Sequence, residues 1–186
     1  MKLTFVTTNH HKFQTLSNSL SSFGINLTNE SLETPEIQDS DLIKIVEYSA
    51  NWAIKEINQP LLVNDFGYFI RALNGFPGPF SKQVIDWFCL EDWQRLLSGL
   101  EDRTVVVKWA YALAAPGKKT RSIVFTMKGK LASKPEVIDG GNNMQRFYIP
   151  EGFEKTYSDL SESERQKYQK SKHSFIDLAD FIKIYF

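Results

Sequence analysis

The sequence contains a single cysteine, Cys89, among its 186 residues, so no disulfide can form within the chain. Cys89 stands in the apolar and aromatic stretch 85–90, and the simplest prediction is a small buried hydrophobe in a protein from a reducing compartment. No charge of one sign dominates, because 22 lysines and arginines balance 22 aspartates and glutamates. This balance provides no general attraction to nucleic acid or acidic membranes, so any anion site must be local.

Long hydrophobic runs are also absent. No apolar run approaches the roughly 20 residues that span a membrane, and the first residues lack a basic segment followed by an apolar one. We therefore expect a soluble, cytoplasmic protein that does not bind a membrane. Nucleic acid is disfavoured as a partner as well, because the net charge is zero and the sequence has no strong basic stripe. Lys167, Lys170 and Lys172 form a small basic group that is typical of a solvated face.

The apolar residues recur in a pattern that predicts strands alternating with helices. Residues 2–7 are expected to form a first strand, and apolar residues at helical spacing follow it up to Gly24, a residue typical of helix ends. The strongest amphipathic helix is predicted over 42–57, and Pro60 closes it ahead of a strand over 61–63.

The second half of the chain contains a hairpin signal. Two β-rich runs, 104–115 and 121–128, flank the turn Pro-Gly-Lys-Lys at 116–119. Further on, a polar segment over 158–172 precedes a predicted terminal helix that begins near Phe175. Since there is no internal repeat or linker, residues 1–186 predict a single α/β domain, in which the long hairpin could form a second lobe beside a cleft.

Two glycines and two prolines shape the segment 73–82, Leu-Asn-Gly-Phe-Pro-Gly-Pro-Phe-Ser-Lys. These residue types predict a tight, preset loop. The loop brings Lys82 close in sequence to Asp65, an acid expected to end the preceding strand. An acid and a lysine placed in this way suit a metal-bound polyphosphate.

A polar loop, residues 7–12, follows the first predicted strand with the sequence Thr-Thr-Asn-His-His-Lys. At a strand-to-helix junction, backbone N–H groups and the helix dipole form an anion site, which Thr7, Asn9 and Lys12 could complete. The alternative, favoured by the loop taken alone, is that Thr8 or Asn9 simply caps the helix.

Six motifs occur in an order that resembles one family, the inosine/xanthosine triphosphate pyrophosphatases. Members of that family hydrolyse non-standard purine nucleoside triphosphates to the monophosphate and pyrophosphate. The resemblance extends over nearly the full chain. The motifs are Thr7-x-Asn9-x-x-Lys12, Pro35-Glu36-Ile37-Gln38, Asp65, the segment 73–82, Leu96-Leu97-x-Gly99-x-x-Asp102-Arg103, and Ile149-Pro150-Glu151-Gly152-x-x-x-Thr156-Tyr157.

The resemblance implies a fold and a phosphate site. The fold would be an elongated mixed β-sheet with flanking helices and two lobes around a central cleft, in a homodimer. Thr7, Asn9 and Lys12 would bind the triphosphate, and Lys82 would reach the phosphates from the opposite loop. The lysines would count as catalytic because they neutralise charge on the departing pyrophosphate.

The resemblance also implies a Mg²⁺ site, because cleavage of a phosphoanhydride suits a hard cation with oxygen ligands. Glu36 and Asp65 would be the metal ligands, and Asp65 would lie near the attacking water. Taken singly, Glu36 could be a solvated loop acid and Asp65 a cap of the following turn. The surrounding motifs favour the functional interpretation for both acids.

The base-recognition segments depart from the family pattern. Where the family has Phe-Gly-Tyr-Asp-Pro between a Gly-Gly pair and the Ile149–Gly152 motif, this chain has Asn-Asn-Met-Gln-Arg at 142–146. Both aromatic residues and the acid are thereby replaced. Of the later Ser-His-Arg segment only His173 transfers, as a substrate-binding residue.

Four further positions differ from the family or are ambiguous. Trp52 stands where a helix lysine is expected, and the lysine before Ser-His-Arg could correspond to Arg165 or Lys167. Asn64 replaces an acid before Asp65, which should weaken Mg²⁺ binding without abolishing it. Phe66 replaces a small hydroxyl residue and could fill part of the phosphate pocket, pack on a sugar or belong to the core.

Two functions are compatible with this pattern. The first is a magnesium-dependent nucleoside triphosphate pyrophosphatase with altered or relaxed base preference, in which the phosphate and metal residues survive. The second is a weak or inactive relative that keeps the fold for nucleotide binding or dimer contact.

Overall fold

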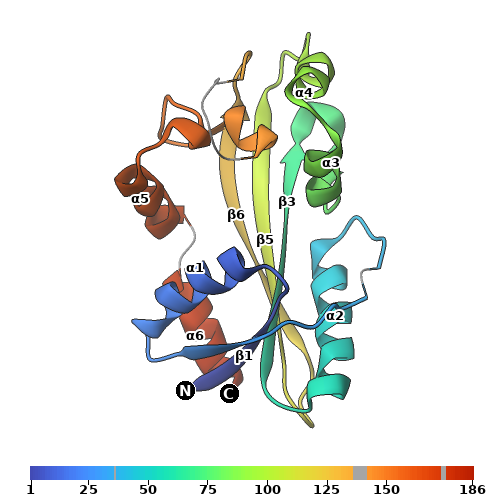
Figure 1. The fold of residues 1–186 in the computed structure, drawn as a ribbon, viewed down its shortest axis with the longest axis vertical. Coiled ribbons are helices and arrows are strands. Elements are labelled where there is room, and N and C mark those ends of the chain that lie inside the picture. The colour runs from blue at the N-terminus through green and yellow to red at the C-terminus, as the bar shows by residue number, and fades with distance from the viewer. Residues whose placement is uncertain (36, 136–141, 173–174) are drawn as a thin grey trace. The chain divides into compact units, whose positions relative to one another are not determined.

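The computed structural model spans residues 1–186 and describes all of them except 36, 136–141 and 173–174 (Figure 1). Within the described residues the strands form one seven-stranded sheet in the order β2-β1-β3-β5-β6-β7, with β4 paired to β3. Parallel and antiparallel pairs both occur, so the mixed α/β sheet implied by the family resemblance is confirmed. The strands are β1 (Lys2–Val6), β2 (Asn26–Glu30), β3 (Leu61–Ile70), β4 (Pro77–Gly78), β5 (Thr104–Ala114), β6 (Arg121–Leu131) and β7 (Tyr148–Pro150).

The helices include every one that the sequence predicts, together with several that it does not. The 12-residue α1 and the 16-residue α2 match the two predicted N-terminal helices. The α-helices of the described residues are α1 (His10–Ser21), α2 (Leu42–Ile57), α3 (Ser81–Trp87), α4 (Leu90–Leu97), α5 (Glu162–Lys172) and α6 (Phe175–Tyr185). Short 3-10 turns are η1 (Arg71–Leu73), η2 (Asn143–Arg146) and η3 (Tyr157–Asp159).

The chain divides into two compact units, which are described separately. Unit 1 comprises residues 1–65, 109–124 and 174–186, and unit 2 comprises 66–108 and 125–173. The division passes through β3, β5 and β6. The prediction that the long hairpin could form a lobe of its own is therefore wrong, because its turn belongs to unit 1 and its outer ends belong to unit 2.

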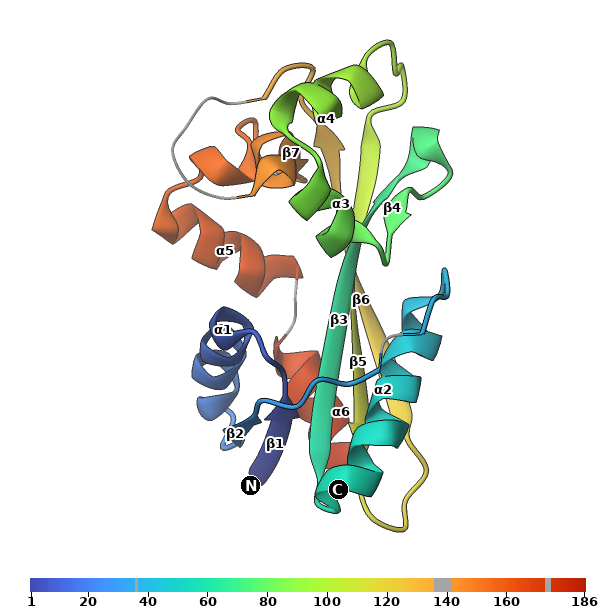
Figure 2. The ribbon, with the colours of Figure 1, turned by 45° about the vertical axis from the view of Figure 1, so that its right-hand side comes forward.

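In unit 1, β1 pairs in parallel with β2 on one side and with β3 on the other. The connection β1-α1-β2 thus runs in the opposite direction along the sheet from β2-α2-β3. Since parallel crossovers are right-handed, the two helices must cover opposite faces. Figures 1 and 2 show α2 on one side of β3 and α1, with α6 beside it, on the other.

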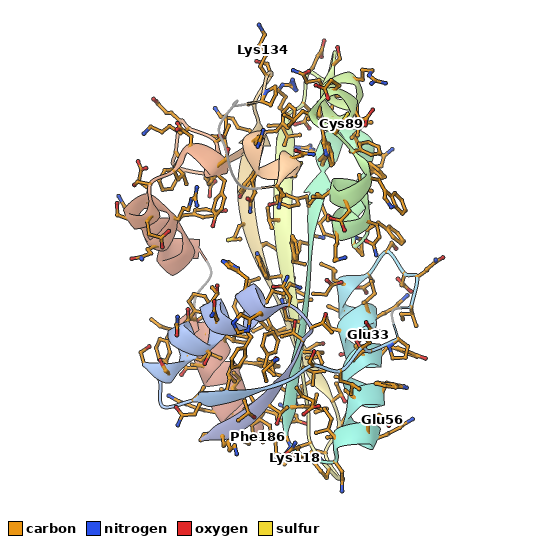
Figure 3. The ribbon with its side chains drawn as sticks, in the orientation of Figure 1. Glu33, Glu56, Cys89, Lys118, Lys134 and Phe186 are labelled. Atoms are coloured by element: carbon orange, nitrogen blue, oxygen red, sulfur yellow. The ribbon has the colours of Figure 1, made fainter. Side chains whose placement is uncertain are left out.

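The core of unit 1 follows from the apolar faces that the sequence predicts. Four of the five residues of β1 are buried, and the buried stripe of α2 includes three small residues, Ser49, Ala50 and Ala53. Lys118 in the hairpin turn donates from Nζ to the carbonyl oxygen of Tyr185, 2.9 Å away. Its ammonium also lies 5.6 Å from the centre of the Phe186 ring, and Figure 3 shows the two side chains together. The hairpin turn thereby holds the end of α6.

In unit 2, the family motif around Leu97 and Arg103 has a structural role. The Arg103 guanidinium donates to the carbonyl oxygen of Leu97, 3.2 Å from Nη1, at the end of α4. The Asp102 carboxylate accepts from the backbone N–H of Thr104 at 2.9 Å and so caps the start of β5. Arginine and acid together fix the turn between α4 and β5.

Two sequence predictions are corrected by the fold. Asp65 does not end a strand: β3 continues for five residues beyond it, because Tyr68 and Phe69 pair with β4. Cys89 is not buried: it is exposed at the N-terminus of α4 (Figure 3), where its thiol donates to Asp92 Oδ2 over 3.0 Å. A residue that caps a helix lies outside the helix's buried face, which explains its exposure.

The hydrogen bond at this helix cap predicts that the Cys89 thiol reacts slowly with alkylating reagents. The hydrogen bond to the Asp92 carboxylate raises the pKa of the thiol, and the thiolate is the form that reacts. We expect Asp92→Asn to lower that pKa and speed alkylation by iodoacetamide severalfold at neutral pH. Asp180→Asn, an exposed acid on α6, is the control. Equal alkylation rates in the two variants would contradict the assignment.

No helix within the described parts of the chain combines the length and the apolar character that crossing a membrane requires.

Candidate functional site

The carboxyl end of β1 is a topological switch point. Because β2 and β3 lie on opposite sides of β1, the chain leaves the end of β1 between two crossovers that run in opposite directions. Open α/β sheets bind their ligands just beyond such a point. The predicted polar loop 7–12 starts there, directly after the last residue of β1, Val6.

Local hydrogen bonds shape this loop. The Asn9 Oδ1 atom accepts from the backbone N–H of Lys12 at 3.0 Å, and the Thr7 Oγ1 atom accepts from the backbone N–H of Asn9 at 3.1 Å. The helix-cap interpretation of Asn9 is therefore confirmed. Capping does not exclude anion binding, because both bonds use side-chain oxygens as acceptors and leave the Thr7 hydroxyl and the Asn9 amide hydrogens as donors. These donors surround the N-terminus of the 12-residue helix α1.

The sheet register brings Asp65 to the same loop. Thr4 pairs with Leu61 and Phe5 with Leu62. Continued past the end of β1, this register sets Asp65 level with Thr8. The half-buried Asp65 carboxylate therefore belongs to the same end of β1 as the loop, although the two are far apart in the sequence.

Alternation along β3 separates Asp65 from its neighbours. Successive side chains of a strand point to opposite faces, so Asn64 and Phe66 lie on the face away from Asp65. Phe66 accordingly packs edge-on against Tyr68, with ring centres 6.0 Å apart. Asn64 has its amide Nδ2 buried without a hydrogen-bond partner. The side chains of Asn64 and Asp65 therefore lie on different faces of β3.

In unit 2, the segment 73–82 is fixed against β3 by close backbone approach. A Cβ atom built on Gly67 would stand 2.2 Å from the carbonyl oxygen of Gly78, so only glycine fits at position 67. Gly78 itself has φ +57° and Gly75 has φ +90°. The left-handed backbone at both positions explains why this loop contains its glycines.

The Ser81 side chain stabilises the same loop through two buried hydrogen bonds. This side chain is fully buried, its Oγ accepts from the backbone N–H of Tyr68 at 2.7 Å, and it donates to the carbonyl oxygen of Gly78 at 2.6 Å. The next residue, Lys82, is the second residue of α3, and its exposed ammonium lies 3.3 Å from the Asp86 carboxylate. An exposed pair at this spacing is weak, so the lysine remains available to a phosphate.

The predicted site residues are divided between the two units. Thr7, Asn9, Lys12 and Asp65 belong to unit 1, whereas Lys82 belongs to unit 2. Glu36 and His173 lie outside the described residues, as does the Gly-Gly pair at 140–141. Within the part of the chain that is described, no three acids, histidines or cysteines gather into a metal site.

The replaced segment 142–146 has taken up structural contacts. Met144 is fully buried, and Asn143 Nδ2 donates to the carbonyl oxygen of Phe88 at 2.7 Å. Gln145 and Asn142 form a reciprocal cap at the start of η2. Arg146 is half-buried, with its Nε buried and unpartnered. None of these side chains supplies the aromatic surface or the acid of the family motif.

The other ambiguous positions are partly resolved. Trp52 is a half-buried residue of α2 and carries no charge to a phosphate. Arg165 donates from Nη2 to the carbonyl oxygen of Ser158 at 2.8 Å and lies over the Tyr157 ring, so it is engaged structurally. Lys167 on the same helix is exposed. Of the two, Lys167 is the one that could reach a ligand.

A cluster of buried tyrosines in unit 2 was missed by the sequence predictions. Tyr68, Tyr148 and Tyr168 are each no more than 5% exposed. They belong to β3, β7 and α5, and a lone aromatic residue in such a segment predicts at most a core position. The hydroxyl contacts between them depend on tertiary packing.

The fold and the site together define a class of protein. It is an open α/β protein in which the polar loop 7–12 and the acid Asp65 lie at the switch point of the sheet. The sequence then matches the profile of the Ham1 family over residues 3–181. The chain therefore belongs to the Ham1 family.

Relatives and solved structures agree with this assignment. A dITP/XTP pyrophosphatase of Methanopyrus kandleri is 31% identical over 98% of this chain and 97% of its own length. A second, from Saccharolobus solfataricus, is 32% identical over 100% of this chain and 95% of its own. The solved structure of a Ham1 protein from Staphylococcus aureus matches the fold with a TM-score of 0.80 at 16% identity, covering 98% of each chain.

Proposed function

We propose that this protein is a magnesium-dependent pyrophosphatase that hydrolyses a nucleoside triphosphate to the monophosphate and pyrophosphate. The observation that carries the proposal is the full-length relationship to proteins named dITP/XTP pyrophosphatase. Its support within the molecule is the meeting of Asp65 with the loop 7–12 at the end of β1. The whole of residues 1–186 would act as one catalytic domain.

Thr7, Asn9 and Lys12 are proposed to bind the phosphates. The hydroxyl, the amide hydrogens and the ammonium are all donors, and they stand at the positive end of the α1 dipole. Lys82 is proposed to bind the same phosphates from the loop of unit 2. Its position is fixed by Ser81, whose buried hydroxyl ties the start of α3 to β3.

Asp65 and Glu36 are proposed to hold Mg²⁺, which prefers carboxylate oxygens. The half-buried Asp65 carboxylate at the switch point fits this role. When bound, the cation would neutralise charge on the triphosphate oxygens. Asp65 is also proposed to orient the water whose oxygen bonds to the α-phosphorus as the bond from that phosphorus to the bridging oxygen breaks. Lys12 and Lys82 would balance charge on the departing pyrophosphate.

The base preference is proposed to be relaxed. A pocket that hydrogen-bonds a base discriminates strongly, because the wrong base leaves buried polar groups unpaired. The proposal is supported by Met144, which belongs to the core, and by Gln145, whose Oε1 atom accepts from the backbone N–H of Asn142. His173 remains the candidate contact from the later segment.

A nucleotide panel tests the function and its specificity together. We expect Mg²⁺-dependent pyrophosphate release from inosine, xanthosine, adenosine and guanosine triphosphates, with kcat/KM values that differ by less than about a hundredfold. Chelation of Mg²⁺ should abolish release. A preference for inosine triphosphate well beyond that range would mean that other residues rebuild the base site. Absence of turnover with all four nucleotides would favour the alternative, an inactive nucleotide-binding relative.

The cellular setting belongs to the same proposal. We place the enzyme in the cytoplasm as a homodimer, the state that the family resemblance implies. Sedimentation of the purified protein at micromolar concentration tests the dimer directly.

A further inference from the structure

Helix α5 is unusually polar for a docked helix. Its sequence is Glu-Ser-Glu-Arg-Gln-Lys-Tyr-Gln-Lys-Ser-Lys, in which Tyr168 is the single apolar or aromatic residue. A helix normally attaches to its domain through an apolar stripe of three or four residues every two turns. The docking of α5 therefore depends on few side chains. Arg165 donates to the carbonyl oxygen of Ser158, and Tyr168, which is 2% exposed, is the aromatic residue that the helix buries.

Tyr168 enters a site made of aromatic rings in unit 2. The Phe153 ring stands perpendicular to it with centres 6.0 Å apart, and the Tyr157 ring lies 6.1 Å away at 67°. Both are edge-on arrangements of the kind that aromatic pairs favour. Its hydroxyl oxygen lies within hydrogen-bond distance of the Tyr148 hydroxyl.

The receiving side chain, Tyr148, is rigidly placed. A Cβ atom on Gly129 would lie 2.4 Å from Cε2 of Tyr148, so the ring occupies the space that a side chain at 129 would need. The Tyr68 ring packs edge-on against it with centres 5.7 Å apart. The Tyr148 hydroxyl donates to the carbonyl oxygen of Lys128 at 3.3 Å.

The two hydroxyls share one hydrogen bond, in which either oxygen can be the donor. Burial raises the pKa of Tyr168 to about 12 and raises that of Tyr148 further. Both hydroxyls therefore stay protonated, and the bond persists over the pH range in which an enzyme of this kind works.

We propose that Tyr168 is a positioning residue for substrate binding, which holds α5 on unit 2 through its ring and its hydrogen bond to Tyr148. The inference rests on the proposed function, because α5 carries the exposed Lys167, the candidate ligand contact of this helix. When α5 is not docked, this lysine loses its fixed place on unit 2, and binding of nucleotide must order the helix at the same time.

Hydrogen exchange and steady-state kinetics on Tyr168→Phe and Tyr168→Ala test the proposal. The phenylalanine variant keeps the ring and removes one hydrogen bond, so amide exchange in 162–172 should quicken about fivefold, the change expected for one such bond. The alanine variant should lose protection in α5 while unit 1 keeps its own. Its KM for inosine triphosphate should rise tenfold or more, while kcat stays within about twofold of the wild type. This result is expected because the lost contacts bind the substrate and the transition state equally well. Tyr168→Phe should restore most of the affinity.

Tyr185→Phe is the matched control. Tyr185 is also buried, and its hydroxyl makes one hydrogen bond to the carbonyl oxygen of Lys119 at 3.2 Å, in unit 1. It should leave both α5 exchange and KM unchanged. Exchange in 162–172 that is no faster in the Tyr168 variants than in this control would overturn the docking role. A fall in kcat at unchanged KM would overturn the role in binding. If the wild type hydrolyses no nucleotide, the proposed function fails, and exchange alone decides the docking role.

Discussion

The variant Asp65→Asn is expected to lose Mg²⁺-dependent pyrophosphate release by about a thousandfold or more, within the range for removing a positioned acid–base group. The substitution removes the charge and keeps the volume. Asp65 is half-buried in the interior of β3, where an asparagine fits the same strand position. The melting temperature should therefore stay within a few degrees of the wild type. Pyrophosphate release with inosine triphosphate and thermal unfolding measure the two effects.

Asp180→Asn makes the same chemical change on the exposed face of α6 and should retain full activity. Activity of Asp65→Asn close to that of this control would show that the carboxylate at the end of β1 is not part of the machinery. A loss accompanied by a large fall in melting temperature would indicate a structural role instead.

Gly67→Ala is expected to destabilise the protein by about 3 kcal/mol or more, at the upper end of the range for overpacking. The added Cβ would meet a backbone oxygen, that of Gly78, at 2.2 Å, and its carbon at 2.7 Å. A flexible side chain could move aside, but this carbonyl belongs to the antiparallel pair of β3 and β4. The pair must open, or the loop that presents Lys82 must shift. Urea unfolding measures the loss.

The variant Gly117→Ala is a control that introduces backbone strain without a steric clash of the new Cβ atom. Gly117 lies in the hairpin turn with φ +73° and with no atom within 4 Å of a built Cβ. Its substitution should cost only about 1 kcal/mol, the strain of a left-handed alanine. Equal losses at 67 and 117 would mean that β4 moves easily and that the close approach at Gly78 is not a constraint.

Elements with a strong apolar period were predictable from the sequence. The first strand, the amphipathic helix α2 and the hairpin of β5 and β6 all occur where their patterns indicate. The strand β2, Asn-Leu-Thr-Asn-Glu, was not predicted, because it lies at the sheet edge and buries one residue of five. The strand β7 and the helix α5 lack an apolar period for the same reason: each docks through few side chains.

The candidate site was predictable in its residue types and not in its geometry. The motifs identified the loop 7–12, Asp65 and the segment ending at Lys82. The strand end proposed at Asp65 was wrong, because Asn-Asp-Phe-Gly has the composition of a turn while the pairing with β4 continues the strand. Likewise, Cys89 stands among apolar residues, and only the start of α4 at Leu90 places it at the surface.

The sequence by itself determined the family, the separate elements and the donors available to phosphate and metal, because local period and residue chemistry are properties of neighbours in the chain. Tertiary structure alone decided which strands flank β1, which face of β3 carries Asp65, how closely Gly67 approaches Gly78, and that Tyr168 meets Tyr148. These are contacts between residues far apart in the sequence. They arise from the packing of whole elements, and no single stretch of the sequence contains a pattern that predicts this packing.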